Sequence, residues 1–469
     1  MSTFYRPSDA AAADFIPFYW KGEYHIFYLK DYRDEAGQGP GVPWFHLVTR
    51  DFVRFDDWGE AIPRGPAGSQ DVWIFTGSVM EHAGTFHIFY TGHNHHMAEV
   101  NQPNEVILHA VSRDLRIWTK DPAFRFAAPA GYEPHDWRDP FVFWNEDAQE
   151  FWMVLAARLT SVGPKRNRGC TALATSKNLQ TWTVRAPLWA PDEYYTHECP
   201  DLFRLGEWWY LVYSTFSERC VTHYRMSRSL QGPWLAPAND TFDARAFYAA
   251  KTAGFAARRY VFGWLPTRAE EKDDGAWQWG GNLVAHEIRQ RADGSLTVRV
   301  PKRVLKPFVN PVPLSPQPWL GPWATEGDVF AATAVGRFSA LGLGALPQEC
   351  PVEADVIFGK GTVSCGLLLR ADAGLDTYYQ VRLEPASQRL VFDRWPRPGD
   401  QAFMLERSLA MKPGKPVRLT LLVDGTCLVV YADDRVAVSA RMYDHRAGAL
   451  GAFVTEGVAR FERVSLRVR

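Results

Sequence analysis

The feature of this sequence that most limits its fold is a short apolar segment that recurs five times. Each copy is a run of β-branched and aromatic residues, which favours a strand over a helix. The copies begin 50 to 65 residues apart, a period typical of propellers and repeat arrays. They occupy residues 24–28, 86–90, 151–155, 209–213 and 259–263. Because one small sheet cannot bury both of its faces, we expect five sheets to pack around a common axis as a five-bladed β-propeller.

A second repeated element predicts the rest of each unit. It is an apolar strand followed by Ser or Thr, then a second short polar residue, before Leu or Phe and an aromatic residue. Such polar residues are typical of a tight turn in which a short side chain bonds nearby backbone. Copies occupy residues 44–55, 107–118, 171–182 and 223–234. Each unit should therefore hold four strands, and residues 282–300, with a hairpin turn at Asp293 and Gly294, should complete the fifth.

The repeat ends near residue 300, where the composition changes. Residues 301–322 contain seven prolines, which cannot donate to a sheet ladder, so we expect a linker over residues 301–324. Alternating strands follow and predict a β-sandwich over residues 325–469. The expected strands of this sandwich are 352–358, 363–370, 378–383, 390–395, 417–423, 427–432 and 461–468. The whole chain is thus expected to be all-β, with the propeller over residues 1–300.

Charge, hydropathy and cysteine spacing argue against several classes of protein. A formal net charge of −1 does not suit a nucleic-acid binder. No apolar run approaches the ~18 residues of a membrane span, and the N-terminus lacks a signal-peptide pattern, so we expect no membrane partner and a cytoplasmic location. The six cysteines are scattered without a CxxC pair, which argues against a zinc site or a disulfide framework. The sequence leaves the oligomeric state open.

Three acidic residues, Asp14, Asp139 and Glu198, hold equivalent places in blades 1, 3 and 4. Each precedes or begins the first strand of its blade, and in a propeller the first strands line the central channel. Asp14 and Asp139 each lie four residues before a phenylalanine, and an even offset keeps strand side chains on one face. We therefore expect three carboxyls from distant parts of the sequence to converge near one axis.

Two interpretations of the three acids are open. Each acid could cap its strand or pair with an arginine, as Arg138 could with Asp139. Alternatively, converging carboxyls raise one another's pKa, which keeps one protonated as a general acid while another stays ionised as a nucleophile. Two carboxyls flanking a glycosidic bond are the arrangement that glycoside cleavage requires. The common repeat register of all three favours the second interpretation.

At these residues the chain resembles glycoside hydrolase family 32, the β-fructofuranosidases of invertase, inulinase and levanase type. The most specific signatures are Arg138-Asp139-Pro140 and Glu198-Cys199. Similarity also extends over residues 21–28, 74–78, 89–92, 247–249 and 263–264. The family's C-terminal β-sandwich corresponds to the strands expected after the linker. The resemblance implies hydrolysis of a terminal furanoside, such as a fructofuranoside of a small oligosaccharide, a fructan or a difructose.

The resemblance also implies a role for each acid in a retaining double displacement. Asp14 would be the nucleophile that forms a covalent glycosyl intermediate. Glu198 would protonate the leaving oxygen and then activate water. Asp139 would hold sugar hydroxyls and stabilise the oxocarbenium-like transition state, and Arg138 would pair with a carboxylate of the site. No cofactor and no metal are implied.

The first family motif is altered in this chain. The family has Trp-Met-Asn-Asp-Pro-Asn-Gly, whereas residues 12–17 read AADFIP, with one residue fewer before the turn at Lys21 and Gly22. Leu29 stands where the family commonly has a glutamine that contacts the sugar. Asp9 is therefore an alternative nucleophile. The substrate could be a fructoside of unusual linkage, a difructose anhydride or an arabinofuranoside.

Further residues are candidate substrate contacts. Trp73 and Phe75 could stack on a sugar or pack between blades, and Thr76 belongs to the family-like segment 74–78. His46 could donate to a sugar or lie satisfied in the core. His197 flanks the expected acid, Lys251 is a weaker candidate, and so are Trp277 and Trp279. The His93, His95 and His96 cluster is expected to be a polar rim loop rather than a metal site.

Other functions remain open from the sequence alone. An inverting or retaining arabinofuranosidase-type enzyme would use the same propeller with three acids. A carboxyl separation of roughly 5–5.5 Å would favour retention, and roughly 6.5–9.5 Å would favour inversion. A non-catalytic sugar-binding propeller would keep its function without Glu198. A protein-interaction propeller would not need acids in the channel.

Overall fold

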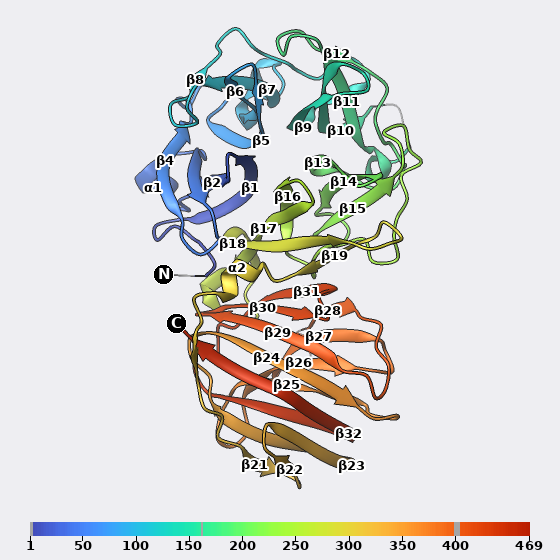
Figure 1. Ribbon diagram of the computed structural model, residues 1–469. Helices are drawn as coiled ribbons and strands as arrows, with labels where there is room; N and C mark the ends of the chain where they lie inside the picture. Colours follow the sequence, from blue (N-terminus) through green and yellow to red (C-terminus); the bar gives the residue numbers. More distant parts are fainter. Residues whose placement is uncertain (1–2, 161–162, 398–403) are drawn as a thin grey trace.

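A computed structural model describes residues 3–160, 163–397 and 404–469 (Figure 1). The N-terminal part is a ring of small sheets, and the C-terminal part is a layered β-sandwich below it in this view. The expected all-β fold, a five-bladed β-propeller followed by a β-sandwich, is confirmed. No helix within the described ranges is both long and apolar enough to cross a membrane.

The first three blades contain four strands each. Blade 1 holds β1 (Ala11–Trp20), β2 (Glu23–Asp31), β3 (Trp44–Thr49) and β4 (Asp56–Ile62). Blade 2 holds β5 (Trp73–His82), β6 (Thr85–His93), β7 (Glu105–Ser112) and β8 (Thr119–Lys120). Blade 3 holds β9 (Tyr132–Asn145), β10 (Glu150–Leu159), β11 (Gly169–Ser176) and β12 (Thr183–Val184).

The last two blades close the ring. Blade 4 holds β13 (Glu198–Leu205), β14 (Trp208–Thr215) and β15 (Val221–Ser227). Blade 5 holds β16 (Tyr248–Phe255), β17 (Arg258–Arg268), β18 (Trp277–Gln290) and β19 (Leu296–Arg299). Blade 4 has isolated bridges where the fourth strand was expected, because residues 235 and 241 pair only singly with β15. The recurring apolar segment is the second strand of every blade: β2, β6, β10, β14 and β17.

The first strands of the blades form the inner wall of the ring. Strands β1, β5, β9, β13 and β16 contact one another in that order, and β16 returns to β1. Blades 1 and 5 are joined by antiparallel pairing of β1 with β18, with Ala12 opposite Gly281. The propeller is therefore closed by a hydrogen-bonded link between the two ends of its own repeat.

All five inner strands carry a β-bulge: the bulge of β5 lies at Thr76, and the other four place a residue at positive φ. The register shifts after Ala13 in β1, at Asp139 in β9, after Glu198 in β13 and after Tyr248 in β16. The bulged residues have positive φ: 44° at Asp14, 58° at Asp139, 52° at Cys199 and 49° at Ala249. Non-glycine residues rarely adopt this conformation, and bulges next to functional sites redirect side chains. Each of these four bulges thus turns a side chain of its inner strand toward the propeller axis.

Residues 301–324 are more ordered than a linker. They include the short helix α2 (Lys302–Leu305) and strands β20 (Asn310–Pro311) and β21 (Gln317–Leu320), and β22 (Ala324–Glu326) begins at their end. Strand β20 pairs with the last strand of the sandwich, and β21 and β22 pair with its first. The prolines fit because these short strands lie at sheet edges, where a ladder donor is not required. The remaining helices are α1 (Glu35–Gln38), η1 (His95–Val100), η2 (Lys165–Asn167) and η3 (Ala269–Glu271).

The sandwich contains long strands that the alternation pattern missed. The strands are β23 (Val329–Ala345), β24 (Glu349–Phe358), β25 (Ser364–Ala371), β26 (Tyr378–Glu384), β27 (Arg389–Trp395), β28 (Met404–Ser408), β29 (Val417–Asp424), β30 (Cys427–Ala432), β31 (Val436–Arg441) and β32 (Ala449–Val468). Strand β23 is rich in alanine and glycine, which gave no strand signal. Strand β32 pairs with β23, β24 and β25, so it holds the centre of the domain together.

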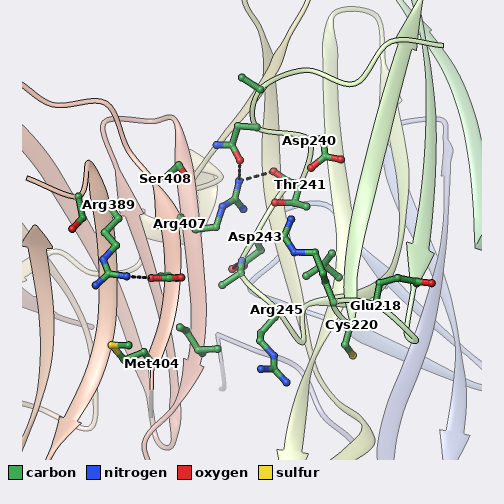
Figure 2. A pocket seen from close by; sticks show the side chains of 18 of the residues that line it. Glu218, Cys220, Asp240, Thr241, Asp243, Arg245, Arg389, Met404, Arg407 and Ser408 are labelled. Carbon is green, nitrogen blue, oxygen red and sulfur yellow. Dashed lines mark hydrogen bonds and ion pairs between the residues drawn. The ribbon is translucent and has the colours of Figure 1, made fainter. Parts of the chain in front are cut away.

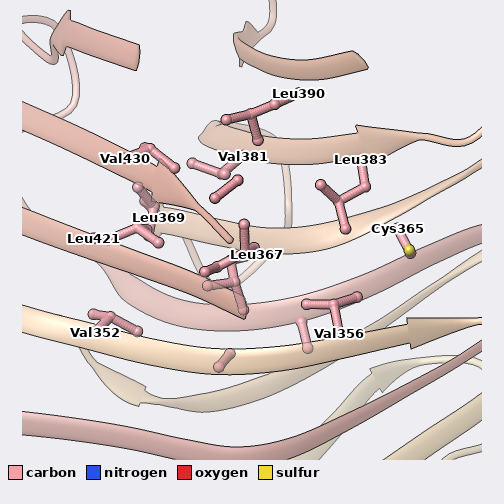
Figure 3. Packing of buried hydrophobic residues seen from close by; sticks show 14 of the residues in the cluster. Val352, Val356, Cys365, Leu367, Leu369, Val381, Leu383, Leu390, Leu421 and Val430 are labelled. Atoms are coloured by element: carbon pink, nitrogen blue, oxygen red, sulfur yellow. The ribbon is translucent and has the colours of Figure 1, made fainter. Parts of the chain in front are cut away.

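The core of the sandwich is aliphatic, as Figure 3 shows around Leu367. The propeller also shares a hydrophobic cluster with the sandwich, because Val429 and Tyr431 of β30 pack with propeller residues. Two buried groups link the domains: Asp243 accepts from Ser439 Oγ at 2.6 Å, and Arg441 donates to the Leu265 carbonyl at 2.8 Å. The sandwich is therefore fixed to the propeller near blade 5.

Leu367 offers a direct test of this core. Leu367→Ala should lower the free energy of unfolding by about 2–5 kcal/mol, because a fully buried leucine leaves a cavity. Val363→Ala is the control, since Val363 is 50% exposed and its truncation should cost less than about 0.5 kcal/mol. Chemical denaturation measures both values. Equal small effects would contradict the packing described.

Candidate functional site

A cavity of about 660 Å³ is lined by the three acids expected from the repeat. Asp14 comes from β1, Asp139 from β9 and Glu198 from the first residue of β13. The bulges bring these side chains into one cavity from positions that are far apart in the sequence. The structure thus unites the three residues that the sequence predicted to converge.

Asp14 lies among groups that disfavour its charge. Burial, followed by the nearby Asp139 and Glu198 carboxyls, raises the pKa of Asp14 from 3.8 to about 8. The Trp264 indole donates to Asp14 Oδ1 at 3.2 Å, and this hydrogen bond acts in the opposite direction. Asp9, the alternative nucleophile, does not line the cavity. It is largely exposed and forms an ion pair with Lys30 at 2.9 Å.

Asp139 is held by its own backbone and by that of the next acidic strand. Its amide donates to Thr91 Oγ1 at 2.8 Å, and its Oδ2 accepts from the Cys199 amide at 2.8 Å. Burial raises the pKa of Asp139 to about 6, although Arg138 opposes the shift. Asp14 and Asp139 thus give the cavity two carboxyls that retain protons well above their ordinary pKa range.

Both carboxyl oxygens of Glu198 accept a hydrogen bond. Arg138 Nη2 donates to Oε1 at 2.9 Å, and the Tyr248 hydroxyl donates to Oε2 at 2.5 Å. Both partners are buried, and the Glu198 side chain itself keeps 20% of its surface exposed to the cavity. The carboxyl is therefore oriented while one face stays accessible to a ligand.

Arg138 lies at the centre of a group of four carboxylates, one of which, Asp136, also pairs with Arg158. Arg138 lies 2.9 Å from Glu198, 2.6 Å from Asp136, 3.3 Å from Glu105 and 3.8 Å from Asp139. Burial alone would lower the pKa of Arg138, but Glu105, Glu198 and Asp139 raise it well above its ordinary value. Because an arginine presents several donors in a fixed plane, one residue can orient several acids.

The remaining wall of the cavity is largely aromatic. Trp73 and Phe75, both expected as sugar contacts, lie in the lining. Phe75 stacks on His93 with ring centroids 4.3 Å apart, which fixes its orientation. Other lining residues are Asp31, Val42, Phe216, Cys220, Tyr248, Trp264, Pro266, Trp277, Gln278 and Trp279. Aromatic rings beside converging acids suit a ligand that has both hydroxyls and apolar ring faces.

The structure places His46, Thr76 and His197 outside the cavity lining. His46 is buried in blade 1, where it hydrogen-bonds His25 at 3.0 Å and stacks on Phe27. Thr76 is fully buried at the bulge of β5. His197 is fully buried and hydrogen-bonds Thr171 Oγ1 at 3.1 Å. Packing accounts for each of these three side chains, and none of them reaches the cavity.

Lys251 affects the pKa values of two of the acids from outside the cavity lining. Its ammonium donates to the Pro200 carbonyl at 2.8 Å and is buried. Its charge lowers the pKa of both Asp14 and Asp139. Lys251 is therefore close enough to affect the site electrostatically, although it is not part of the lining.

Sequence reasoning missed Tyr248, Trp264 and Asp31 as site residues. Tyr248 and Trp264 lie in the family-like segments 247–249 and 263–264, and they pair across β16 and β17. Tyr248 begins the inner strand β16 and Trp264 lies opposite it on β17, and this placement was the signal that could have identified them. Asp31 is the last residue of β2 and lies beyond the recurring segment 24–28, so the repeat pattern gave no indication of its position.

The histidine-rich loop does not line the cavity but packs against two lining residues, with His95 next to Trp73 and His93 stacked on Phe75. His96 pairs with Glu99 at 3.0 Å, and His93 Nδ1 lies 3.6 Å from Glu105. Within residues 3–160, 163–397 and 404–469, no group of three or more His, Cys, Asp or Glu side chains is arranged to hold a metal ion.

A second cavity, of about 700 Å³, lies between the propeller and the sandwich. Figure 2 shows Arg389, Met404 and Arg407 on the sandwich side, facing propeller residues such as Asp243 and Arg245. Phe216 and Cys220 line both cavities, so this interdomain cleft adjoins the acidic cavity.

Comparison with protein families identifies both parts of the chain. Residues 16–293 match the family model described as "Glycosyl hydrolases family 32 N-terminal domain". Residues 335–468 match "Glycosyl hydrolases family 32 C terminal".

Named relatives align over part of their length. Levanbiose-producing levanase of Bacillus subtilis (strain 168) is 30% identical over 199 residues, which cover 40% of this chain and 34% of that protein. Raffinose invertase of Escherichia coli is 28% identical over 329 residues, which cover 64% of this chain and 63% of that protein. The chain thus spans less than two thirds of either relative.

Solved structures show the same fold over nearly the whole chain. Sucrose-6-phosphate hydrolase from Lactobacillus gasseri has a TM-score of 0.74 at 18% identity, covering 99% of this chain and 92% of that one. Exo-inulinase from Aspergillus awamori has a TM-score of 0.75 at 17% identity, covering 99% and 97% respectively.

The acidic cavity predicts a specific pH dependence of stability. Because burial raises the pKa of Asp14 to about 8 from 3.8, the folded chain keeps a proton that the unfolded chain loses between these values. The contribution of Asp14 to stability therefore falls as pH rises through this range. Relative to the parent, Asp14→Asn should gain more than about 2 kcal/mol of unfolding free energy between about pH 5 and pH 8.

The control for this measurement is Asp9→Asn. Lys30 lowers the pKa of Asp9, so this variant should show no such gain on raising the pH. Denaturant titrations at several pH values give both differences. A pH-independent difference for Asp14→Asn would contradict the proposed environment of this carboxyl.

Proposed function

We propose that this chain, which belongs to glycosyl hydrolase family 32, cleaves terminal β-fructofuranosides of small oligosaccharides. The observation that carries the proposal is the cavity in which Asp14, Asp139 and Glu198 meet beside one guanidinium and an aromatic wall. The names of the relatives, levanase and raffinose invertase, support fructoside substrates. The arabinofuranosidase and non-catalytic alternatives are not favoured by these matches.

In the proposed reaction Asp14 attacks the anomeric carbon of the bound fructosyl unit. As the bond to the leaving oxygen breaks, Glu198 donates its proton to that oxygen. Water then attacks the covalent intermediate, Glu198 accepts a proton from the water, and the carboxylate of Asp14 is released. The two inversions give net retention of configuration.

Asp139 and Arg138 support this chemistry without forming a bond to the sugar. Asp139, held by two backbone contacts, is placed to accept hydrogen bonds from sugar hydroxyls as positive charge develops at the anomeric carbon. Arg138 and Tyr248 orient Glu198 by hydrogen bonds to its two carboxyl oxygens.

The proposed reaction requires the carboxyls of Asp14, Asp139 and Glu198 to share one proton. The raised pKa values of Asp14 and Asp139 keep a proton in the cavity near neutral pH, and interacting carboxyls titrate as a set. This proton is the one that Glu198 must carry when the substrate is in place.

The expected cytoplasmic location remains a prediction.

Sugar release from a defined panel tests the proposed function. The panel contains sucrose, 1-kestose, inulin, levan, a difructose anhydride and aryl β-fructo- and arabinofuranosides. We expect fructose from one or more fructosides. Arabinose alone would contradict the proposed substrate class.

Glu198→Gln should lower kcat/KM by about 10²–10⁴-fold, because the amide cannot donate the proton that the leaving oxygen needs. The loss should be smaller for an aryl fructoside, whose leaving group needs less protonation. Glu207→Gln is the control: Glu207 lies in the turn after β13, and its side chain is 80% exposed. Undiminished fructose release by Glu198→Gln would refute the assigned role.

A further inference from the structure

We propose that residues 269–279, here called the rim segment, form the subsite for the leaving group. The sandwich holds this segment in place. The rim segment selects an uncharged leaving group with an apolar ring face. This inference rests on the proposed function and specifies which part of the chain contacts the departing sugar. It also gives the sandwich a role in building the active site.

The rim segment connects β17 to β18 and ends in the cavity wall. Its last residues, Trp277, Gln278 and Trp279, all line the acidic cavity. Trp279 is 39% exposed, a high value for so large an apolar side chain. Phe216 from blade 4 also lines the cavity and is 46% exposed. Exposed aromatic rings at a cavity mouth offer surfaces on which an apolar sugar face can stack.

The sandwich holds the rim segment through Asp273, whose side chain is fully buried. Asp273 Oδ1 accepts from the Tyr443 amide at 2.8 Å, and Oδ2 accepts from the Tyr379 hydroxyl at 2.5 Å. Arg394 Nη1 lies 3.3 Å from Oδ2, and the Asp273 amide donates to Asp444 Oδ1 at 3.1 Å. Because a buried carboxylate is tolerated only when its hydrogen bonds are made, this attachment fixes the segment closely.

The propeller holds the other end of the rim segment through Arg33. Arg33 Nη1 donates to Gln278 Oε1 at 2.9 Å, and Nη2 donates to the Trp279 carbonyl at 2.6 Å. Trp277 packs against the hydrophobic cluster of the sandwich and carries the Arg245 guanidinium 4.4 Å from its ring centre. The two tryptophans are thus placed by contacts from both domains.

The charges of the lining decide which leaving group fits. The lining contains four acids, Asp14, Asp31, Asp139 and Glu198, and a single basic residue, Arg138. Arg138 is already surrounded by carboxylates, so it offers no unpaired charge to an anion. A phosphate or carboxylate on the leaving sugar would therefore meet net negative charge within the lining, whereas a neutral ring can stack on Trp277 and Trp279. Two arginines touch the rim segment from outside the lining: Arg33 is paired with Asp31, and Arg245 lies over the Trp277 ring.

The test removes one hydroxyl from the anchor and compares leaving groups. Tyr379→Phe deletes the hydroxyl that donates to Asp273 and accepts from the Asp444 and His445 amides, and Tyr379 does not line the cavity. We expect the KM for sucrose and 1-kestose to rise about fivefold, a binding loss of about 1 kcal/mol, with kcat nearly unchanged. For methyl β-fructofuranoside, whose methanol leaving group is too small to reach the rim segment, both constants should change less than about twofold.

Two further variants keep the test independent of folding. Arg33→Ala releases the other end of the rim segment and should give the same split between substrates. Ser439→Ala is the matched control, because it also deletes one hydroxyl from a buried interdomain carboxylate, that of Asp243, but leaves the rim segment attached. Its KM values should equal those of the parent. Thermal unfolding of each variant reports whether the fold is intact.

Leaving-group charge is tested with the parent chain. We expect kcat/KM for sucrose to exceed that for sucrose 6-phosphate by at least about tenfold. A preference for the phosphate would overturn the inferred selectivity and would point to Arg245 as its source.

The outcomes separate this inference from the proposed function. Equal KM changes in Tyr379→Phe and Ser439→Ala, or equal effects on sucrose and the methyl glycoside, would overturn the inference alone. A parent chain that releases fructose from no substrate would overturn the proposed function and the inference with it.

Discussion

The interaction on which the site depends is the contact of one buried guanidinium with four carboxylates. Arg138 lies within 4 Å of Glu105, Asp136, Asp139 and Glu198. Gathering acids in a cavity is costly, because each ionised carboxyl destabilises its neighbours and burial opposes the charge of all of them. Arg138, which lines the same cavity, offsets part of this cost by pairing with the carboxylates. The raised pKa values of Asp14 and Asp139 show that the compensation is incomplete.

The geometry of the acids comes from a strained feature of the repeat. Asp14, Asp139, Cys199 and Ala249 occupy left-handed backbone at matching bulges of four inner strands. Such residues are tolerated where surrounding structure fixes them, which here is the closed ring and the β1–β18 pairing. The repeat that closes the ring thus supplies several equivalent positions at which a side chain can point toward the central axis. In three blades that position is occupied by, or adjoins, a carboxyl.

Much of this arrangement could be predicted from sequence, for definable reasons. The second strands of the blades repeat in composition, so the propeller and the inward placement of Asp14, Asp139 and Glu198 followed from register. Strand β23 was missed because its alanines and glycines carry no strand signal, and the proline-rich segment was assigned to a linker because its pairing partners are distant. Residues whose position depends on three-dimensional packing, such as His46 buried against Phe27, could not be assigned from patterns.

The rim of the cavity shows the limit of prediction most clearly. Trp277 and Trp279 could be named as weak candidates, but nothing in the repeat indicated that Asp273 binds the sandwich or that Arg33 holds Gln278. These contacts join segments more than a hundred residues apart. The site therefore combines acids at repeated positions, which the sequence predicts, with a rim segment that has no counterpart in the repeat and whose contacts only the fold reveals.

The most direct test of the account is the configuration of the product formed when the chain acts on an aryl β-fructofuranoside in aqueous methanol. A covalent intermediate on Asp14 can be captured by methanol, and two successive inversions preserve the anomeric configuration. The account predicts methyl β-fructofuranoside as the first-formed methyl glycoside, identified by nuclear magnetic resonance. Formation of the α-anomer would contradict Asp14 as nucleophile and the retaining mechanism built on it.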